Sequence, residues 1–180
     1  MAHWRVADGK LLRMRGHRVG LLVKQVRELE WLLSVRLPDE YVAFLRRYNG
    51  GWPDKTRSFE WRGRDGRVQR DYGLLFFDAL LPPESNSGIV WATRMCGHEL
   101  RRQTGGLPDG AVVVGAEAIG DLIVVLCKGR RRGEVWIKSM EQTAQLLMGH
   151  RGRRLLPQTC LFRLAGSFRE FIGKLHADDA

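Results

Sequence analysis

From residue 20 onward, apolar residues recur along the chain at helical spacing. Between residues 20 and 34 this repeat consists of Leu21, Leu22, Val26, Leu29 and Leu33. Side chains three or four positions apart lie on one face of an α-helix. The repeat therefore predicts a helix over about 20–34. Residues 1–18, which precede it, are polar and basic, and we expect an arm or a first strand there.

A second helix is predicted within LPDEYVAFLRRYNGGWP, residues 37–53. Its apolar face is formed by Tyr41, Phe44, Leu45 and Tyr48. Pro38 suits the first helical turn, and the acidic residues that follow it complement the positive end of the helix dipole. We expect Asn49-Gly50-Gly51 to end the helix in the left-handed conformation, and Pro53 prevents its continuation.

After Pro53 the pattern becomes that of strands. Segments 59–62 and 68–70 flank Asp65-Gly66, a strong tight-turn dipeptide, which predicts a β-hairpin. Residues 74–77 predict a short buried strand, and the spacing of apolar residues in 88–102 predicts a helix with Gly97 in its middle. Three further strands, over 111–114, 122–127 and 134–137, are expected to form an antiparallel meander.

The last local signal is Ser167-Phe168-Arg169-Glu170, which has the form of a capping box. In such a box the serine and glutamate side chains each accept a hydrogen bond from the other's backbone amide. It predicts a helix with Phe168, Phe171, Ile172 and Leu175 on one face. Strands in the middle with helices at both ends predict one α+β domain over 19–176, with a central antiparallel sheet and a disordered tail at 177–180.

Composition narrows the class of protein. The chain of 180 residues fits one domain, and no apolar run approaches the roughly 20 residues of a membrane span. The N-terminus lacks the apolar run of a signal peptide, so we expect a cytoplasmic protein without a membrane partner. Three widely spaced cysteines (Cys96, Cys127 and Cys160) are interpreted as free structural thiols. The net charge of +10 predicts an acidic partner, which could be a protein, a nucleic acid or an anionic lipid.

Several of these segments resemble the signature of the SUKH superfamily. They are LPDEY (37–41), FL (44–45), NGGWP (49–53), LP (107–108), GDLI (120–123), GEVW (133–136) and LAGSFREF (164–171). The resemblance runs from about residue 20 to 176, and it implies a bacterial immunity protein that neutralises a toxin by direct binding. Some eukaryotic relatives are regulatory scaffolds, for example in yeast cell-wall synthesis. The resemblance implies no common catalytic activity, no cofactor and no metal.

The residues that carry the resemblance have a structural explanation as helix start, core and cap. They are Leu37, Pro38, Tyr41, Phe44, Asn49, Gly50, Gly51, Pro53, Gly120, Asp121, Trp136, Ser167, Phe168 and Phe171. Asp121 is open to a second interpretation, since a carboxylate at the entrance of a strand can bind a ligand. An Asp after Gly more often accepts a hydrogen bond from a turn amide. The five histidines are scattered and match no catalytic or metal-binding motif.

Arginine groups are the candidate partner-binding residues. They are Arg62, Arg64, Arg67 and Arg70 on the hairpin, Arg130, Arg131 and Arg132 at a strand turn, and Arg151, Arg153 and Arg154 in a late loop. These groups either lie in solvated loops or form an interface. The chemistry suits an interface, because the guanidinium group binds carboxylates and phosphates in a bidentate manner. Trp61 and Trp136 lie next to two of the groups, which suits a protein interface or single-stranded nucleic acid. The main hypothesis is an immunity protein whose partner is a toxin with an acidic surface. The alternatives are that the protein is a nucleic-acid-binding regulator or a scaffold domain. The segment 139–160 is long and basic for a compact member of the superfamily.

Overall fold

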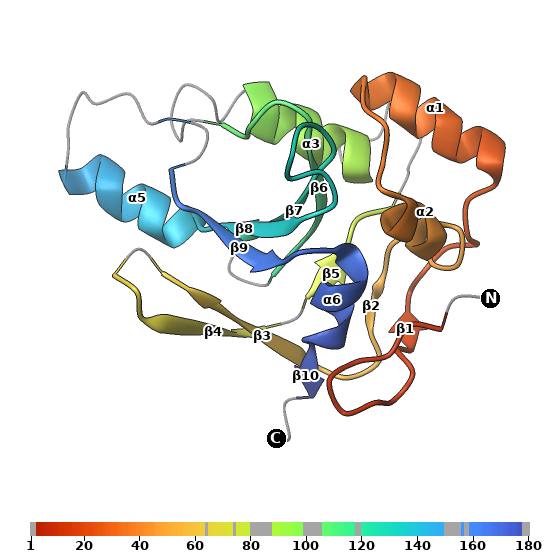
Figure 1. Ribbon diagram of the computed structural model, residues 1–180, viewed down its shortest axis with the longest axis horizontal. Helices are drawn as coiled ribbons and strands as arrows, with labels where there is room; N and C mark the ends of the chain where they lie inside the picture. Colours follow the sequence, from red (N-terminus) through yellow and green to blue (C-terminus); the bar gives the residue numbers. More distant parts are fainter. Residues whose placement is uncertain are drawn as a thin grey trace.

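The centre of the molecule is a five-stranded antiparallel sheet, seen in the computed structural model of the protein (Figure 1). The structure describes residues 3–63, 65–73, 75–79, 88–98, 106–117, 120–149, 156 and 159–177. The strand order is β5 (Phe76–Phe77), β6 (Ala111–Ala116), β7 (Leu122–Leu126), β8 (Val135–Lys138) and β9 (Leu161–Ala165). Strands β6, β7 and β8 pair in succession, which confirms the predicted meander. Strand β9 continues it along the edge of β8 and was not predicted.

The central strands are covered on both faces, which explains why they read as continuous apolar runs. Val112 and Val125 face the main core, which also contains residues of four helices and of the hairpin. Val113 and Val124 face a second, smaller cluster on the opposite side, where Ala92 of α3 (Gly88–His98) packs. Figure 1 shows α3 on one side of the sheet and the hairpin on the other. The mixture of helices with one large antiparallel sheet is the α+β class that the sequence predicts.

Five helices lie in the described part of the chain. They are α1 (Val23–Leu33), α2 (Asp39–Leu45), α3 (Gly88–His98), α5 (Met140–Gly149) and α6 (Phe168–Gly173). Helix α1 begins after Leu22, which is exposed, so the predicted start at about residue 20 is too early. Helix α3 occupies the predicted segment as far as His98, and the expected residues 99–102 lie outside the described part. Helix α5 begins within the long segment 139–160, where the sequence had predicted no element.

Helix α2 is shorter than predicted, because it ends at Leu45 and does not reach Tyr48. After Leu45 the chain leaves the helix and forms hydrogen bonds with the N-terminal segment. The Tyr48 hydroxyl donates to the Leu12 carbonyl at 3.0 Å, and the Arg18 amide donates to the Asn49 carbonyl at 3.1 Å. Gly50 and Gly51 have positive φ angles of 75° and 98°, but they shape the loop after Asn49 and do not cap the helix.

Two smaller sheets complete the fold. The predicted hairpin is confirmed as β3 (Arg57–Arg62) paired with β4 (Val68–Gly73), and β10 (His176–Ala177) pairs with the other edge of β3. Residues 178–180 and Leu74 lie outside the described part. At the N-terminus, β1 (Met14–Arg15) pairs with β2 (Trp52–Pro53). Trp4, Val6, Leu12 and Met14 of the same segment are buried in the main core.

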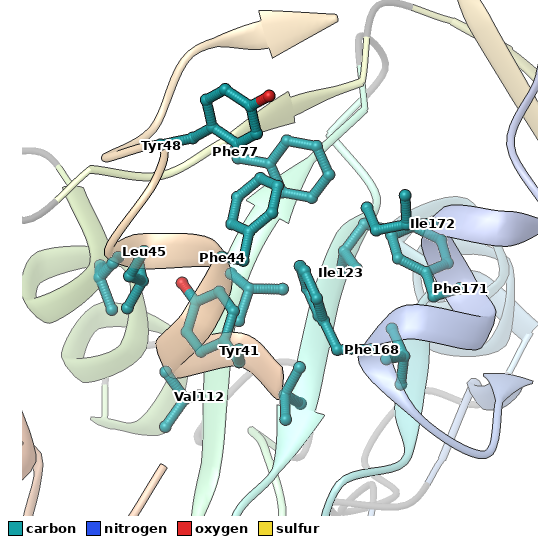
Figure 2. Packing of buried hydrophobic residues seen from close by; sticks show 14 of the residues in the cluster. Tyr41, Phe44, Leu45, Tyr48, Phe77, Val112, Ile123, Phe168, Phe171 and Ile172 are labelled. Atoms are coloured by element: carbon teal, nitrogen blue, oxygen red, sulfur yellow. The ribbon is translucent and has the colours of Figure 1, made fainter. Parts of the chain in front are cut away.

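The core is centred on aromatic rings from α2, α6 and β5 (Figure 2). The Phe44 ring lies 5.0 Å from Phe168 and 4.8 Å from Phe77, measured between ring centroids. Tyr41 and Phe171 are also fully buried. The helical spacing of these residues therefore predicts the faces by which α2 and α6 pack.

The N-terminus of α6 differs in one detail from the predicted capping box. The Glu170 amide donates to Ser167 Oγ at 3.2 Å, as expected. The Glu170 carboxylate, however, accepts from the Gly166 amide at 2.7 Å and not from the amide of Ser167. Lys174 binds the same carboxylate at 2.6 Å from the next turn of the helix.

Candidate partner-binding surface

Most residues that carry the family resemblance lie too deep to meet a partner. Leu37, Tyr41, Phe44, Phe168 and Phe171 are each at most 1% exposed. Pro38, Asn49, Gly50 and Pro53 are buried as well, while Gly51, Trp136 and Ser167 are half-buried. Side chains at this depth hold the core together and leave partner binding to other residues.

Asp121 is used to anchor helix α5. Its Oδ1 atom accepts a hydrogen bond from the Met140 amide at 2.6 Å, and its own amide donates to Glu117 Oε1 at 2.7 Å. Burial raises the pKa of the Asp121 carboxyl, and hydrogen bonds from Met140 and Ser139 oppose that rise. Gly120 precedes it with a φ of 99°. This arrangement supports the structural interpretation of Gly120-Asp121, because the carboxylate already serves the first turn of α5.

A cluster of charged and aromatic side chains surrounds Trp136 on the outer strands of the sheet. The indole Nε1 donates to Glu134 Oε2 at 3.0 Å, and the Arg131 guanidinium lies 5.2 Å from the centroid of the Trp136 ring. Arg163 of β9 approaches the same glutamate, with Nε 3.4 Å from Oε1. Arg131 thus contacts Trp136, and Arg163 contacts Glu134, within the Glu134–Trp136 pair.

A groove of about 510 Å³ runs between the hairpin and β9 with the end of α6, and we call it the β9 groove. Trp61, Arg62 and Val68 line it from the hairpin side. Arg163, Lys174 and His176 line it from the other side. Because Arg163 also pairs with Glu134, it connects the groove to the Trp136 cluster. Basic side chains therefore line both sides of this groove, together with Trp61 and the acidic Glu60 on the hairpin side.

The structure separates the predicted arginines into different roles. Arg62 lines the β9 groove, Arg131 stacks on Trp136 and Arg130 is exposed at the turn. Arg67 forms an ion pair with Asp65 at 3.5 Å, and Arg132 donates to the Leu37 carbonyl at 2.8 Å, tying the turn to the start of α2. Arg64 and the group Arg151, Arg153 and Arg154 lie outside the described residues.

Sequence reasoning missed Arg163 and Lys174. Arg163 is the one charged residue in the apolar segment Leu161–Ala165, and a charge inside such a run marks an exposed position of a strand. That signal was present, but β9 itself had not been predicted. Lys174 lies beyond the last turn of α6, where its ammonium group also donates to the Leu164 carbonyl at 3.0 Å. Nothing local in the sequence indicates this long contact.

Two of the three cysteines are buried and offer no reactive thiol. Cys127 and Cys160 are free and buried. Burial raises the pKa of the Cys127 thiol to about 12, so it stays protonated near neutral pH and is a poor nucleophile. Within the described ranges, no group of three or more His, Cys, Asp or Glu side chains is placed to hold a metal ion.

The fold and the β9 groove together define a class of protein: an α+β domain with a basic groove that contains a tryptophan and is suited to binding a partner. Residues 20–174 match the SMI1 / KNR4 family (SUKH-1), and the chain belongs to that family. The match confirms the resemblance to the SUKH superfamily. A search of curated proteins finds no match to the chain. None of the described helices is long and apolar enough to span a membrane.

Proposed function

We propose that this protein is an immunity protein that neutralises a cognate bacterial toxin by direct, stoichiometric binding and carries no catalytic activity of its own. The observation that carries the proposal is membership of the SMI1 / KNR4 family (SUKH-1) over residues 20–174. Immunity proteins are typical of that family. In this role the protein acts in the cytoplasm, where it meets the toxin.

The β9 groove and the adjoining turn are the proposed contact surface for an acidic region of the toxin. Arg62 and Arg130 are exposed, and neither forms an ion pair with another described residue. Guanidinium groups bind carboxylates in a bidentate manner, and tryptophan next to arginine is common at the energetic centres of protein interfaces. A specific complex of ordinary size buries about 1,600 Å² in total. The excess positive charge speeds association with an acidic partner more than it sets the final affinity.

A nucleic-acid-binding role is the second candidate. It is favoured by Trp61 lying beside Arg62 in the groove, because bases stack on aromatic rings while arginines neutralise phosphates. Such binding falls steeply as salt rises, since neutralised phosphates release counterions. A scaffold domain that tunes a resident cellular enzyme is a third candidate, distinguished by its partner.

The deciding experiment is a pull-down with the product of the neighbouring gene, followed by co-expression to test growth rescue. A tight 1:1 complex that rescues growth supports the proposal. The double variant R62E/R131E should weaken both complex formation and rescue. The matched control R27E/R36E changes the net charge equally at exposed positions on and after α1 and should leave both intact. Absence of a complex, with nucleic acid co-purifying at low salt and lost at high salt, would overturn the proposal in favour of the second candidate.

A further inference from the structure

The described residues that line a second hollow on the molecule are glycines and aromatic residues. It measures about 480 Å³ and is formed by Gly16, Gly51, Trp52, Phe76 and Phe77, and we call it the Trp52 pocket. Trp52 is 46% exposed and Phe76 is 41% exposed, which is unusually high for aromatic side chains. Strand β2, which carries Trp52, and strand β1, which ends just before Gly16, lie at one end of the molecule, and the tip of the β3–β4 hairpin lies at the other (Figure 1).

Close backbone packing shapes this pocket. A Cβ atom at Gly16 would lie 2.6 Å from the Trp52 ring, and one at Gly51 would lie 2.5 Å from the Arg15 carbonyl oxygen. Both glycines also have positive φ angles, of 60° and 98°. The two positions therefore require glycine, and together they hold the Trp52 ring over the β1 backbone while its other side stays accessible.

Five exposed arginines come from the segments that surround the pocket. They are Arg13, Arg15 and Arg18 of the N-terminal segment, and Arg46 and Arg47 after α2. Arg15 is the cross-strand partner of Trp52, so the two side chains share a face of the ladder. Arg13 shares that face, because it alternates with the buried residues Leu12 and Met14.

The α2 side of this cluster is joined to the N-terminal segment by specific contacts. Arg47 Nε donates to the Tyr48 hydroxyl at 2.9 Å, and the Tyr48 ring packs edge-to-face with His17 at 5.3 Å between centroids. Arg18 forms a backbone bridge with Asn49. None of the five arginines forms an ion pair within the described part of the chain. On the hairpin, in contrast, Arg67 and Arg70 are both ion-paired.

The chemistry of this surface selects among possible occupants. A second copy of the chain would bring five arginines against five, which like-charge repulsion opposes. The edges of a nucleic-acid base would find almost no hydrogen-bonding groups in a lining of glycine, phenylalanine and tryptophan, and unpaired polar groups are costly to bury. A bilayer requires projecting apolar side chains, whereas this surface is hollow. A peptide with an apolar side chain flanked by carboxylates fits this surface, because the apolar side chain fills the pocket and the carboxylates contact the arginines.

We propose that the Trp52 pocket is a second docking site, which binds an acidic peptide segment of a partner protein by seating one large apolar side chain between Trp52 and Phe76 while carboxylates on either side contact the surrounding arginines. This inference is independent of the β9 groove and does not require the partner to be a toxin. It assigns a binding role to Trp52 and to the N-terminal arginines.

The probe is a short synthetic peptide in which one phenylalanine is flanked on both sides by glutamates. It is titrated into the full chain labelled with ¹⁵N, and the indole N–H signals of the six tryptophans are followed. The Trp52 signal, assigned through W52F, should shift and saturate while those of Trp61 and Trp136 stay unchanged. A peptide with glycine in place of phenylalanine should bind much more weakly.

Two variants separate charge from shape. R15E/R18E leaves the pocket intact and should weaken binding about tenfold, as expected for two lost exposed ion pairs and added repulsion. W52A removes one wall and should weaken binding about thirtyfold, as for an aromatic at the centre of an interface. R27E/R36E, which carries the same charge change, should bind as the wild type does.

Three results would overturn the inference. One is a shift of the Trp61 or Trp136 signal without that of Trp52. Another is an equal loss of binding in R15E/R18E and R27E/R36E, which would reduce the effect to net charge. The third is tighter engagement of Trp52 by oligo(dT) or by phosphatidylserine vesicles than by the peptide, which would assign the surface to nucleic acid or to membrane. Failure of toxin binding alone would leave these measurements untouched, so the two proposals can fail separately.

Discussion

Asp78 gives the clearest test of how the central sheet meets α2. The residue follows β5, and its amide donates to the Val114 carbonyl of β6 at 2.9 Å. The neighbouring Tyr41 of α2 is fully buried, and its hydroxyl has no hydrogen-bond partner among the residues that the structure describes. Burial raises the pKa of the Asp78 carboxyl from 3.8 to about 6. The charged form is therefore disfavoured in the folded protein.

This shift predicts that the charge on Asp78 costs stability near neutral pH. Between pH 4 and pH 6 the folded state holds a proton that the unfolded state has released, so the free energy of unfolding falls as pH rises. Moving the pKa from 3.8 to about 6 corresponds to a loss of about 3 kcal/mol, complete above pH 6. Asn has nearly the same shape and carries no charge. D78N should therefore be more stable than the wild type by up to about 3 kcal/mol at pH 7, and similar to it below pH 4.

The assay is urea denaturation of both proteins across this pH range. The midpoints are compared, provided that the free energy of unfolding falls with urea concentration at the same slope in both proteins. Asp8 and Glu170 have lowered pKa values, and they are unchanged in the variant, so their contributions cancel in the comparison. A D78N protein with the same pH profile as the wild type, or with no gain at pH 7, would refute the reasoning. It would mean that the Asp78 carboxylate is solvated in the folded state.

The remaining predictions concern stability at the buried and capping positions. Phe44→Ala should lower the free energy of unfolding by about 3–5 kcal/mol, since the ring is completely buried, whereas Trp31→Ala, at a position 78% exposed, should change it by less than about 0.5 kcal/mol in the same denaturation experiment. Ser167→Ala should cost about 1 kcal/mol through loss of the α6 cap, and Ser167→Gly only a few tenths; equal losses in thermal melts would contradict a capping role. Asp121→Ala should cost about 1–2 kcal/mol and speed hydrogen exchange at the Met140 amide, and unchanged exchange there would show that the carboxylate does not anchor α5.

The candidate site was only partly accessible to sequence reasoning. The local pairing of arginine with tryptophan pointed to Arg62 and Arg131, which the structure places at the β9 groove and at the Trp136 cluster. It also included Arg132, whose guanidinium group is engaged by the Leu37 carbonyl 95 positions away. The arginines around the Trp52 pocket cannot be grouped from the sequence, because Arg15 and Trp52 become neighbours only when β1 pairs with β2.

The α+β class, the hairpin, the meander and the faces by which α2 and α6 pack follow from local sequence patterns. These depend on apolar spacing, turn dipeptides and caps, which act over a few residues. Three features became visible only in the folded chain: the end of α2, the place of β9 at the edge of the sheet, and the ion pairs of the described arginines. Those outcomes depend on contacts between segments far apart in the chain, such as Tyr48 with Leu12 and Arg169 with Glu40. A local pattern specifies which side chains are apolar and which are charged. The contacts that bury or pair them form only when distant segments pack together.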